Sequence, residues 1–255
     1  AETGGGGDAV VVADSSGPRP LHLLLDAGDD SKAAAYLEGA GIDTLDLMVL
    51  THAHFDHYGG MAEVLDAAHV RAFAYNGQVR TEPSYQAVLA RVAAEADTTF
   101  VVAATTVWQS AAGGVEVTLM APLATYLGID TDDGAELNEG SLGIQLRQGS
   151  FAFLSTGDAE ILASGRFSST CPALVDVEAL KVGHHGSADA TQGFWLDATT
   201  PRVAVVSANG TTHPHGSVLD LMERRRVEIF CTPQHGMVTF RVEADGDYAV
   251  ATQKD

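Results

Sequence analysis

The segment from His52 to His57 has the clearest capacity for chemistry, because it carries four metal-ligand side chains within six residues. It follows an apolar run that is typical of a buried strand. Alternate residues of an extended chain point the same way, so His52 and His54 can hold one cation. Asp56 and His57, where the chain turns into a helix, can hold a second cation close by. Imidazole and carboxylate ligands suit Zn²⁺ and also Mn²⁺ or Fe, so the segment predicts two metal half-sites.

Two later segments supply further ligands for such a pair of ions. The apolar run Phe151–Ser155 leads into Asp158, whose carboxylate would stand at a sheet edge and bridge both metals. Another strand-like run leads into His184 and His185, and open α/β sheets gather their sites at the carboxyl ends of strands. One of these histidines should complete the second metal, and we favour His184.

This ligand set predicts hydrolytic chemistry with two divalent ions, zinc or manganese, as cofactors. Two adjacent ions lower the pKa of a bridging water toward neutrality, so that hydroxide is available as the nucleophile. The same ions polarise the scissile oxygen and hold its developing charge. In this mechanism Asp158 orients the bridging hydroxide.

The elements around these residues alternate between strands and helices. The expected strands are Ala9–Ala13, Leu21–Leu25, Leu45–Leu50, His69–Ala74, Val115–Met120, Ser141–Arg147, Phe151–Ser155, Glu178–Val182, Arg202–Ser207, Glu228–Cys231 and Val238–Val242. The expected helices are Ser31–Gly39, Gly59–Ala68, Pro83–Ala96, Gln192–Asp197 and Gly216–Arg225, with a loop over Pro122–Gly140. Two strand-rich halves with intervening helices predict sheets packed face to face with helices outside, a layered α/β sandwich.

On these residues the chain resembles the metallo-β-lactamase superfamily. The H-x-H-x-D-H motif of that superfamily stands intact as His52 to His57, and Asp26 and Asp158 occupy the places of its first and fourth motifs. More narrowly, the chain resembles the ComEC-type competence hydrolase domain and its free-standing relatives. The residues that carry this second resemblance are Gly7-Asp8-Ala9, Asn138-x-x-Ser141, Thr156 to Glu160, Leu180 to Ser187 and His213-Pro214-His215.

The resemblance covers nearly the whole chain and implies an αββα four-layer metallo-β-lactamase sandwich with hydrolytic, chiefly phosphodiester, chemistry. It implies that Asp26 lies behind the ligands and holds an imidazole in the correct tautomer. It also implies catalytic roles for Asp56, Asp158, His185 and His213, and substrate binding by Asn138, Ser141 and Ser187.

The chain departs from most superfamily members because no histidine occurs between His69 and His184. The first metal would then have only His52, His54 and Asp158 as ligands. Catalytic zinc commonly has three protein ligands plus water, so this set leaves one position open for water.

The formal charge of −20, from 34 acidic and 14 basic side chains, repels polyanions and bears on the substrate. It favours a small phosphodiester over single-stranded DNA, unless the acidity is an adaptation to high salt, where charges are screened. The leading interpretation is a phosphodiesterase, either a ComEC-like nuclease or a hydrolase of small phosphodiesters. The alternatives are a lactam, lactone or thioester hydrolase on the same fold, or a non-catalytic metal-binding module.

No linker or charge block divides the sequence, so we expect one hydrolase domain over residues 1–255. No apolar stretch approaches the roughly 20 residues that span a bilayer, so we expect a soluble chain without a membrane segment. The abrupt Gly-rich start suggests that a leader or an upstream domain once preceded it, and the location would then be extracytoplasmic. The cellular location is otherwise left open.

Overall fold

The computed structural model describes residues 7–109 and 114–254. The chain divides into two compact units, the first formed by Ala1–Ala104 with Ala121–Leu142, and the second by Thr105–Met120 with Gly143–Asp255. Each unit combines a sheet with helices, which confirms the α/β class. The expectation of a single domain stays a prediction.

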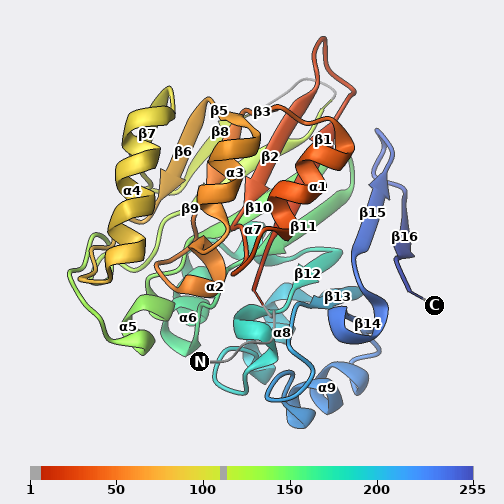
Figure 1. The fold of residues 1–255 in the computed structure, drawn as a ribbon. Coiled ribbons are helices and arrows are strands. Elements are labelled where there is room, and N and C mark those ends of the chain that lie inside the picture. The colour runs from red at the N-terminus through yellow and green to blue at the C-terminus, as the bar shows by residue number, and fades with distance from the viewer. Residues whose placement is uncertain (1–6, 110–113, 255) are drawn as a thin grey trace. The chain divides into compact units, whose positions relative to one another are not determined.

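Unit 1 is built on a five-stranded sheet in the order β1-β2-β4-β6-β7 (Figure 1). β1 and β2 form an antiparallel hairpin, and the other neighbours are parallel. Every residue of the central strand β4 is buried, which explains why this strand is apolar throughout rather than alternating. The five strands are Val10–Asp14, Leu21–Leu25, Leu47–Val49, Ala72–Tyr75 and Thr98–Val101.

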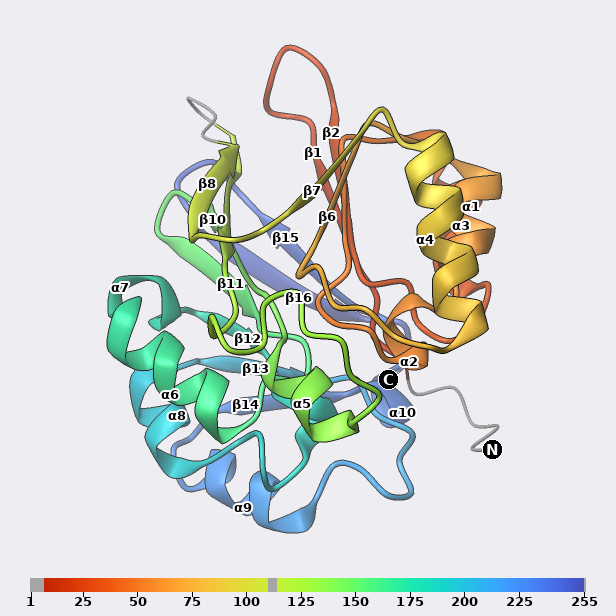
Figure 2. The same cartoon turned by 90° about the vertical axis from the view of Figure 1, so that its left-hand side faces the viewer.

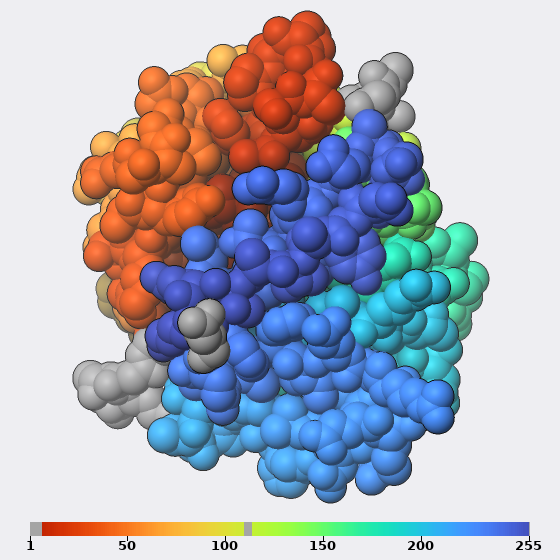
Figure 3. All heavy atoms as spheres, turned by 90° about the vertical axis from the view of Figure 1, so that its right-hand side faces the viewer, coloured from red at the N-terminus to blue at the C-terminus, as the bar shows by residue number. Residues whose placement is uncertain are grey.

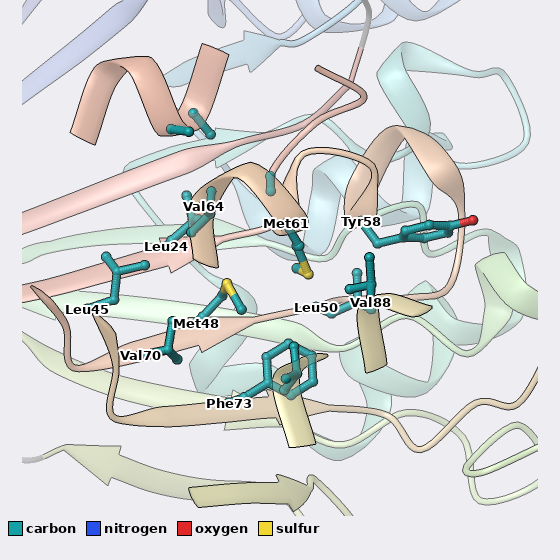
Figure 4. Packing of buried hydrophobic residues seen from close by; sticks show 14 of the residues in the cluster. Leu24, Leu45, Met48, Leu50, Tyr58, Met61, Val64, Val70, Phe73 and Val88 are labelled. Carbon is teal, nitrogen blue, oxygen red and sulfur yellow. The ribbon is translucent and has the colours of Figure 1, made fainter. Parts of the chain in front are cut away.

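Three helices cover one face of this sheet (Figure 1, Figure 2). They are α1 (Lys32–Ala40), α3 (Met61–Ala67) and α4 (Pro83–Glu95). Figure 4 shows Met48 and Phe73 of the sheet packed with Met61 and Val64 of α3 in one core cluster. Full burial of each such side chain is worth about 1.5–3 kcal/mol, so this core fixes the strand ends that lead into the histidine segment.

Two expected strands of unit 1 are each interrupted. The run Leu45–Leu50 divides into β3 (Thr44–Leu45) and β4, and the run His69–Ala74 divides into β5 (His69–Val70) and β6. β3 and β5 pair with each other in a separate two-stranded sheet. The first break falls at Asp46, whose buried carboxylate accepts hydrogen bonds from the Arg19 side chain and the His22 backbone N–H.

The expected loop Pro122–Gly140 contains a helix, α5 (Gly134–Glu139). Asp133 caps this helix, because its side chain accepts hydrogen bonds from the backbone N–H groups of Ala135 and Glu136. The prediction of a loop was therefore wrong, and the cap was the signal that could have found the helix.

Unit 2 is built on a seven-stranded sheet in the order β14-β13-β12-β11-β10-β9-β8. β8 to β11 are antiparallel neighbours, and β11 to β14 are parallel. The seven strands, in chain order, are Thr106–Gln109, Glu116–Met120, Gly143–Gln148, Phe151–Ser155, Ala179–Lys181, Val203–Val206 and Glu228–Cys231.

Helices cover the parallel part of this sheet (Figure 2). They are α6 (Ile161–Thr170), α7 (Pro172–Val175), α8 (Gly193–Thr199) and α9 (Gly216–Glu223). Phe167 and Trp195 from these helices pack on Leu154 and Leu180 of the strands. The core therefore holds the carboxyl ends of β11 and β12 beside each other.

The chain ends in a two-stranded hairpin, β15 (Val238–Val242) and β16 (Tyr248–Thr252), which follows the short helix α10 (Thr232–His235). Residues of this C-terminal region, in dark blue, form part of the surface in Figure 3. Tyr248 packs its ring on Phe151 of β11, with ring centroids 5.0 Å apart. The strands β7, β8 and β16 and the helix α6 were not expected from the sequence.

Within the described ranges, no helix is long and apolar enough to cross a membrane.

Candidate metal centre

The histidine segment of unit 1 follows β4 and enters the short helix α2 (Phe55–Tyr58). His52 is fully buried, and its Nε2 lies 2.9 Å from Nδ1 of His54. The two rings meet edge to face with centroids 4.8 Å apart. The structure therefore brings a ring nitrogen of His52 and one of His54 close to each other.

Asp26 holds the imidazole of His57. The Asp26 Oδ2 lies 2.8 Å from His57 Nδ1, and both residues are buried. Asp26 also accepts hydrogen bonds from the backbone N–H and the hydroxyl of Thr51, at 2.8 Å each. A carboxylate acceptor at Nδ1 keeps the hydrogen there and leaves the Nε2 lone pair for a ligand bond, which is the arrangement that we expected for Asp26.

Within unit 1, the carboxylate of Asp8 lies close to the imidazole of His57. Asp8 received no role in the predictions from the sequence. Asp8 is 3% exposed, and it offers a ligand atom within 4.8 Å of one from His57. Its backbone N–H donates to the Asp56 carbonyl at 3.0 Å. A Cβ at Gly7 would lie 2.5 Å from the same carbonyl oxygen, so glycine permits this close approach. Asp56 itself is half-buried in the first turn of α2.

The two polar residues expected to bind substrate lie at the end of α5 in the same unit. Asn138 and Ser141 are buried, and the Ser141 N–H donates to the Asn138 carbonyl at 2.9 Å. The start of α5 approaches the histidine segment, because a Cβ at Gly134 would lie 3.4 Å from His54 Nε2. After Ser141, the Leu142 N–H donates to the Thr51 carbonyl at 3.0 Å, so this end of the segment also lies beside the residue that precedes His52.

In unit 2, Asp158 and His185 form the second group of ligand side chains. Asp158 lies after β11 and is 2% exposed, and its Oδ2 is 3.4 Å from His185 Nε2. The other ring nitrogen of His185, Nδ1, lies 2.9 Å from the backbone carbonyl of Ser207. This carbonyl keeps the hydrogen on Nδ1 and directs Nε2 toward Asp158.

His184 has a different setting, although we favoured it as the ligand. Its Nδ1 lies 3.1 Å from Glu160 Oε1, and its Nε2 lies 4.0 Å from Asp158 Oδ2. The ring of His213 stacks on that of His184, with centroids 5.8 Å apart and an interplanar angle of 26°. The geometry therefore favours His185 as the ligand and places His184 with His213.

The backbone of this segment adopts an uncommon conformation. His184 and His185 have φ values of 46° and 53°, in the left-handed region that costs about 1–3 kcal/mol for residues other than glycine. Both lie in the 3₁₀ turn η1 (Gly183–Gly186), which Ser187 closes by donating its N–H to the His184 carbonyl at 2.7 Å. Ser187 is buried beside the imidazole pair.

Lys181 is a buried amine next to Asp158, and the sequence analysis did not single it out. Its Nζ donates to the Gly157 carbonyl at 3.1 Å and lies 3.6 Å from Asp158 Oδ1. Burial lowers the pKa of Lys181 to about 7. A charged residue within the apolar run of β12 was the signal that could have identified it.

The donor sets of both units fit divalent transition metals. They consist of imidazole nitrogens and carboxylate oxygens, in agreement with the preferences of zinc and manganese. Each unit contributes at least one imidazole and one carboxylate with ligand atoms within 4.8 Å of each other. Ligand-type side chains that could hold a metal are thus present in both halves of the chain.

Comparisons with known proteins agree on one superfamily. The family profile described as the metallo-beta-lactamase superfamily matches residues 3–210. The chain is 28% identical over 209 residues to ComE operon protein 3 of Bacillus subtilis, covering 81% of this chain and 26% of that protein. It is 28% identical over 232 residues to Competence protein ComA of Neisseria gonorrhoeae, covering 88% of this chain and 30% of that protein. The chain therefore spans less than a third of the length of these relatives.

Among solved structures, the chain is similar to Tm1679, described as a metal-dependent hydrolase of the beta-lactamase superfamily. The TM-score is 0.56 at 14% identity, with 92% of this chain and 91% of that chain covered. This similarity confirms the expected metallo-β-lactamase fold.

Proposed function

This chain belongs to the metallo-β-lactamase superfamily, and we propose that it is a metal-dependent phosphodiesterase. The observation that carries the proposal is the presence in each unit of buried imidazoles and carboxylates whose ligand atoms lie within 4.8 Å of one another. Buried ionisable groups are costly unless they are paired or coordinate metals, so two such groups at strand ends favour metal binding over a structural role.

We assign the ligands of two divalent ions, zinc or manganese, from these groups. One ion takes His52, His54 and Asp158, and the other takes Asp8, His57, Asp158 and His185. His185 replaces His184 in this assignment because the Ser207 carbonyl orients its ring. Asp8 is added to the expected set, and Asp56 stays predicted as a further ligand of the ion that His57 holds.

Bound divalent ions would supply Lewis acidity, which activates water and polarises the phosphoryl oxygen. The residues of the chain provide the positioning. Asp26 keeps the hydrogen of His57 on Nδ1, and Ser207 does the same for His185. Water adds to phosphorus and gives up one proton, the bond from phosphorus to the leaving oxygen breaks, and one proton is returned to the leaving oxygen, so the products are an alcohol and a phosphomonoester. The stacked pair of His184 and His213 is our candidate for hydrogen bonding to that oxygen.

The phosphate of the substrate also needs neutral hydrogen-bond donors. We assign this role to three buried residues: Ser187, which follows the His184-His185 pair, and Asn138 and Ser141 at the end of α5. Single-stranded DNA stays a candidate substrate on the ground of the resemblance to ComEC-type competence hydrolases. The charge of −20 supports a small phosphodiester instead, because it disfavours long polyanions.

An activity panel with the metal-loaded protein tests the proposal. The substrates are bis-(p-nitrophenyl) phosphate, single-stranded DNA and nitrocefin, and we expect cleavage of the first. Rapid opening of nitrocefin without phosphodiester cleavage would show instead that the protein is a lactam hydrolase on the same fold. Metal binding without hydrolysis of any of the three would favour a non-catalytic module.

A further inference from the structure

A short polar segment after β6 contacts the backbone of the histidine segment. The side chains of Asn76, Gln78 and Arg80 form this segment, which we call the polar strap. Asn76 Nδ2 donates to the Thr51 carbonyl at 3.2 Å. Gln78 Oε1 accepts the N–H of Ala53 at 3.0 Å, and Arg80 Nη1 donates to the Ala53 carbonyl at 2.6 Å. The strap therefore holds both backbone groups of the residue between His52 and His54.

The same side chains reach the α5 segment on their other side. Asn76 Nδ2 also donates to the Gly140 carbonyl at 2.7 Å, and Gln78 Nε2 donates to the Leu137 carbonyl at 3.0 Å. A Cβ at Gly140 would lie 2.2 Å from Gln78 Nε2, so the approach depends on glycine there. The amide of Gln78 thus spans the distance between the histidine segment and the helix that carries Asn138.

Gln78 is fully buried, and all of its polar groups are engaged. Its backbone N–H donates to Asn76 Oδ1 at 3.0 Å, and its carbonyl accepts from the Tyr85 hydroxyl at 2.9 Å. Buried backbone groups need partners, so satisfying them is the simplest role for such a side chain. Satisfying backbone groups does not by itself require a single side-chain amide, that of Gln78, to connect Ala53 to the α5 segment.

We propose that Gln78 is a positioning residue for the half-site formed by His52 and His54. It acts through Ala53, whose N–H it holds, and so sets the angle between the two imidazoles. No histidine between His69 and His184 can supply a third imidazole to this half-site, so its geometry depends on the backbone that carries the other two. This inference rests on the proposed metal-dependent function.

The test is calorimetric titration of the metal-free protein with Zn²⁺, comparing wild type with Gln78→Met. Methionine keeps the length and apolar bulk of the side chain but forms neither amide hydrogen bond. We expect one of two zinc-binding steps to weaken by about 10–100-fold, as when a partner behind a metal ligand is lost, while the other step is unchanged. A purely structural role would weaken both steps or neither, and either result would overturn the proposal.

Gln86→Met is the matched control. Gln86 is exposed on α4 and donates one side-chain hydrogen bond to the strap, at the Arg80 carbonyl, without reaching the histidine segment. We expect both zinc steps of this variant to equal those of wild type, and an equal loss in Gln86→Met would overturn the proposal. If Gln78→Met does not fold, Arg80→Met at the more exposed end of the strap removes the donor to the Ala53 carbonyl. The same selective loss is then expected.

A second variant locates the affected step. In a His54→Ala background, the zinc step sensitive to Gln78→Met should already be lost, so the second substitution should have no further effect. A further loss of zinc affinity would contradict action through this half-site. Cleavage of bis-(p-nitrophenyl) phosphate by wild type tests the phosphodiesterase function separately from the positioning role of Gln78. Selective zinc loss in Gln78→Met together with an inactive wild type would leave the inference standing and reject the phosphodiesterase.

Discussion

His184 and His185 are adjacent in sequence, but different groups hold their rings. The Ser207 carbonyl fixes Nδ1 of His185 and directs Nε2 at Asp158, whereas Glu160 engages Nδ1 of His184. A ligand imidazole needs a lone pair aimed at the ion and a hydrogen-bond partner behind it. Both rings have such a partner, but Nε2 lies 3.4 Å from Asp158 Oδ2 in His185 and 4.0 Å in His184. His185 is therefore the better candidate for the ligand, and His184 for contact with substrate.

Substitution of the two histidines should therefore have different effects on zinc content and turnover. We expect His185→Asn to lose one zinc ion per chain, and His184→Asn to retain wild-type zinc content but turn over substrate more slowly. Elemental analysis after loading and dialysis, with turnover measured on the same samples, makes the comparison. His22 lies in β2 of unit 1, far along the chain from His184 and His185, so His22→Asn should change neither the zinc content nor the turnover. Loss of zinc in His184→Asn alone would reverse the assignment.

Asp158 is the proposed ligand of both ions, so its loss should be more damaging than that of any single imidazole. Asp158→Asn keeps the volume and one oxygen but removes the charge. We expect turnover to fall by at least the roughly 10–100-fold that loss of a partner behind a ligand costs. Thermal unfolding of the metal-free protein should show that the variant is folded. Activity within twofold of wild type would show that the bridge is assigned to the wrong residue.

The parts of the site that the sequence predicts are those whose members are close in sequence. His52 to His57 could be recognised because the ligand types are consecutive, and Asp158 because it ends an apolar strand. Asp8 stood in a motif that carries the resemblance but received no role, and Gln78 was not recognised, because the importance of both comes from contacts with residues far along the chain. The order within His184-His185 depends on the left-handed backbone at both residues, which no local pattern indicates.

At the scale of elements, α4 supports the polar strap through one buried hydroxyl. Tyr85 lies on the buried face of α4, and its hydroxyl donates to the Gln78 carbonyl at 2.9 Å. Burial raises the pKa of Tyr85 well above its ordinary value. Above a pH of about 10, tyrosine ionises in the unfolded chain while the buried side chain stays neutral. Stability from this group is thus fully present below that pH and decreases as the pH rises further.

Tyr85→Phe should consequently change both stability and its alkaline dependence. We expect the free energy of unfolding at pH 7 to fall by about 1–3 kcal/mol, because the Gln78 carbonyl loses its donor. Above pH 10 the variant should lose stability less steeply than wild type. Urea unfolding of the metal-free protein from pH 7 to 11 measures both, with the exposed Tyr36→Phe as control. If the free energy of unfolding fell equally steeply above pH 10 for wild type and Tyr85→Phe, the proposed contribution of the buried Tyr85 hydroxyl to the pH dependence would be wrong.

The sequence predicted the elements with continuous apolar spacing and missed those without it, including α6, which is ten residues long. The strand β11 and the helix α4 were found because apolar spacing is continuous over each of them. The helix α5 is six residues long and is held by its Asp133 cap rather than by an apolar face. The break between β3 and β4 follows from tertiary hydrogen bonds to Asp46, which periodicity cannot register.

At the scale of the whole molecule, the charge of −20 constrains how DNA could bind. Contacts would come from the ions and neutral donors such as Asn138 and Ser141, so few phosphates would be neutralised by basic side chains. The salt slope of single-strand binding is about −0.7 per neutralised phosphate. We expect metal-loaded protein to bind single-stranded DNA weakly, with affinity nearly independent of added salt. A steep decline in fluorescence-anisotropy titrations between low and moderate salt would contradict this prediction.

The most direct test of metal-dependent phosphodiester hydrolysis is a metal titration of activity. Chelated wild-type protein is supplied with Zn²⁺ or Mn²⁺ in steps, and hydrolysis of bis-(p-nitrophenyl) phosphate is followed at each step. The two-ion assignment predicts no hydrolysis without metal and a rise that is complete at two equivalents per chain. Hydrolysis that survives chelation, or its absence at full loading of both metals, would contradict the account.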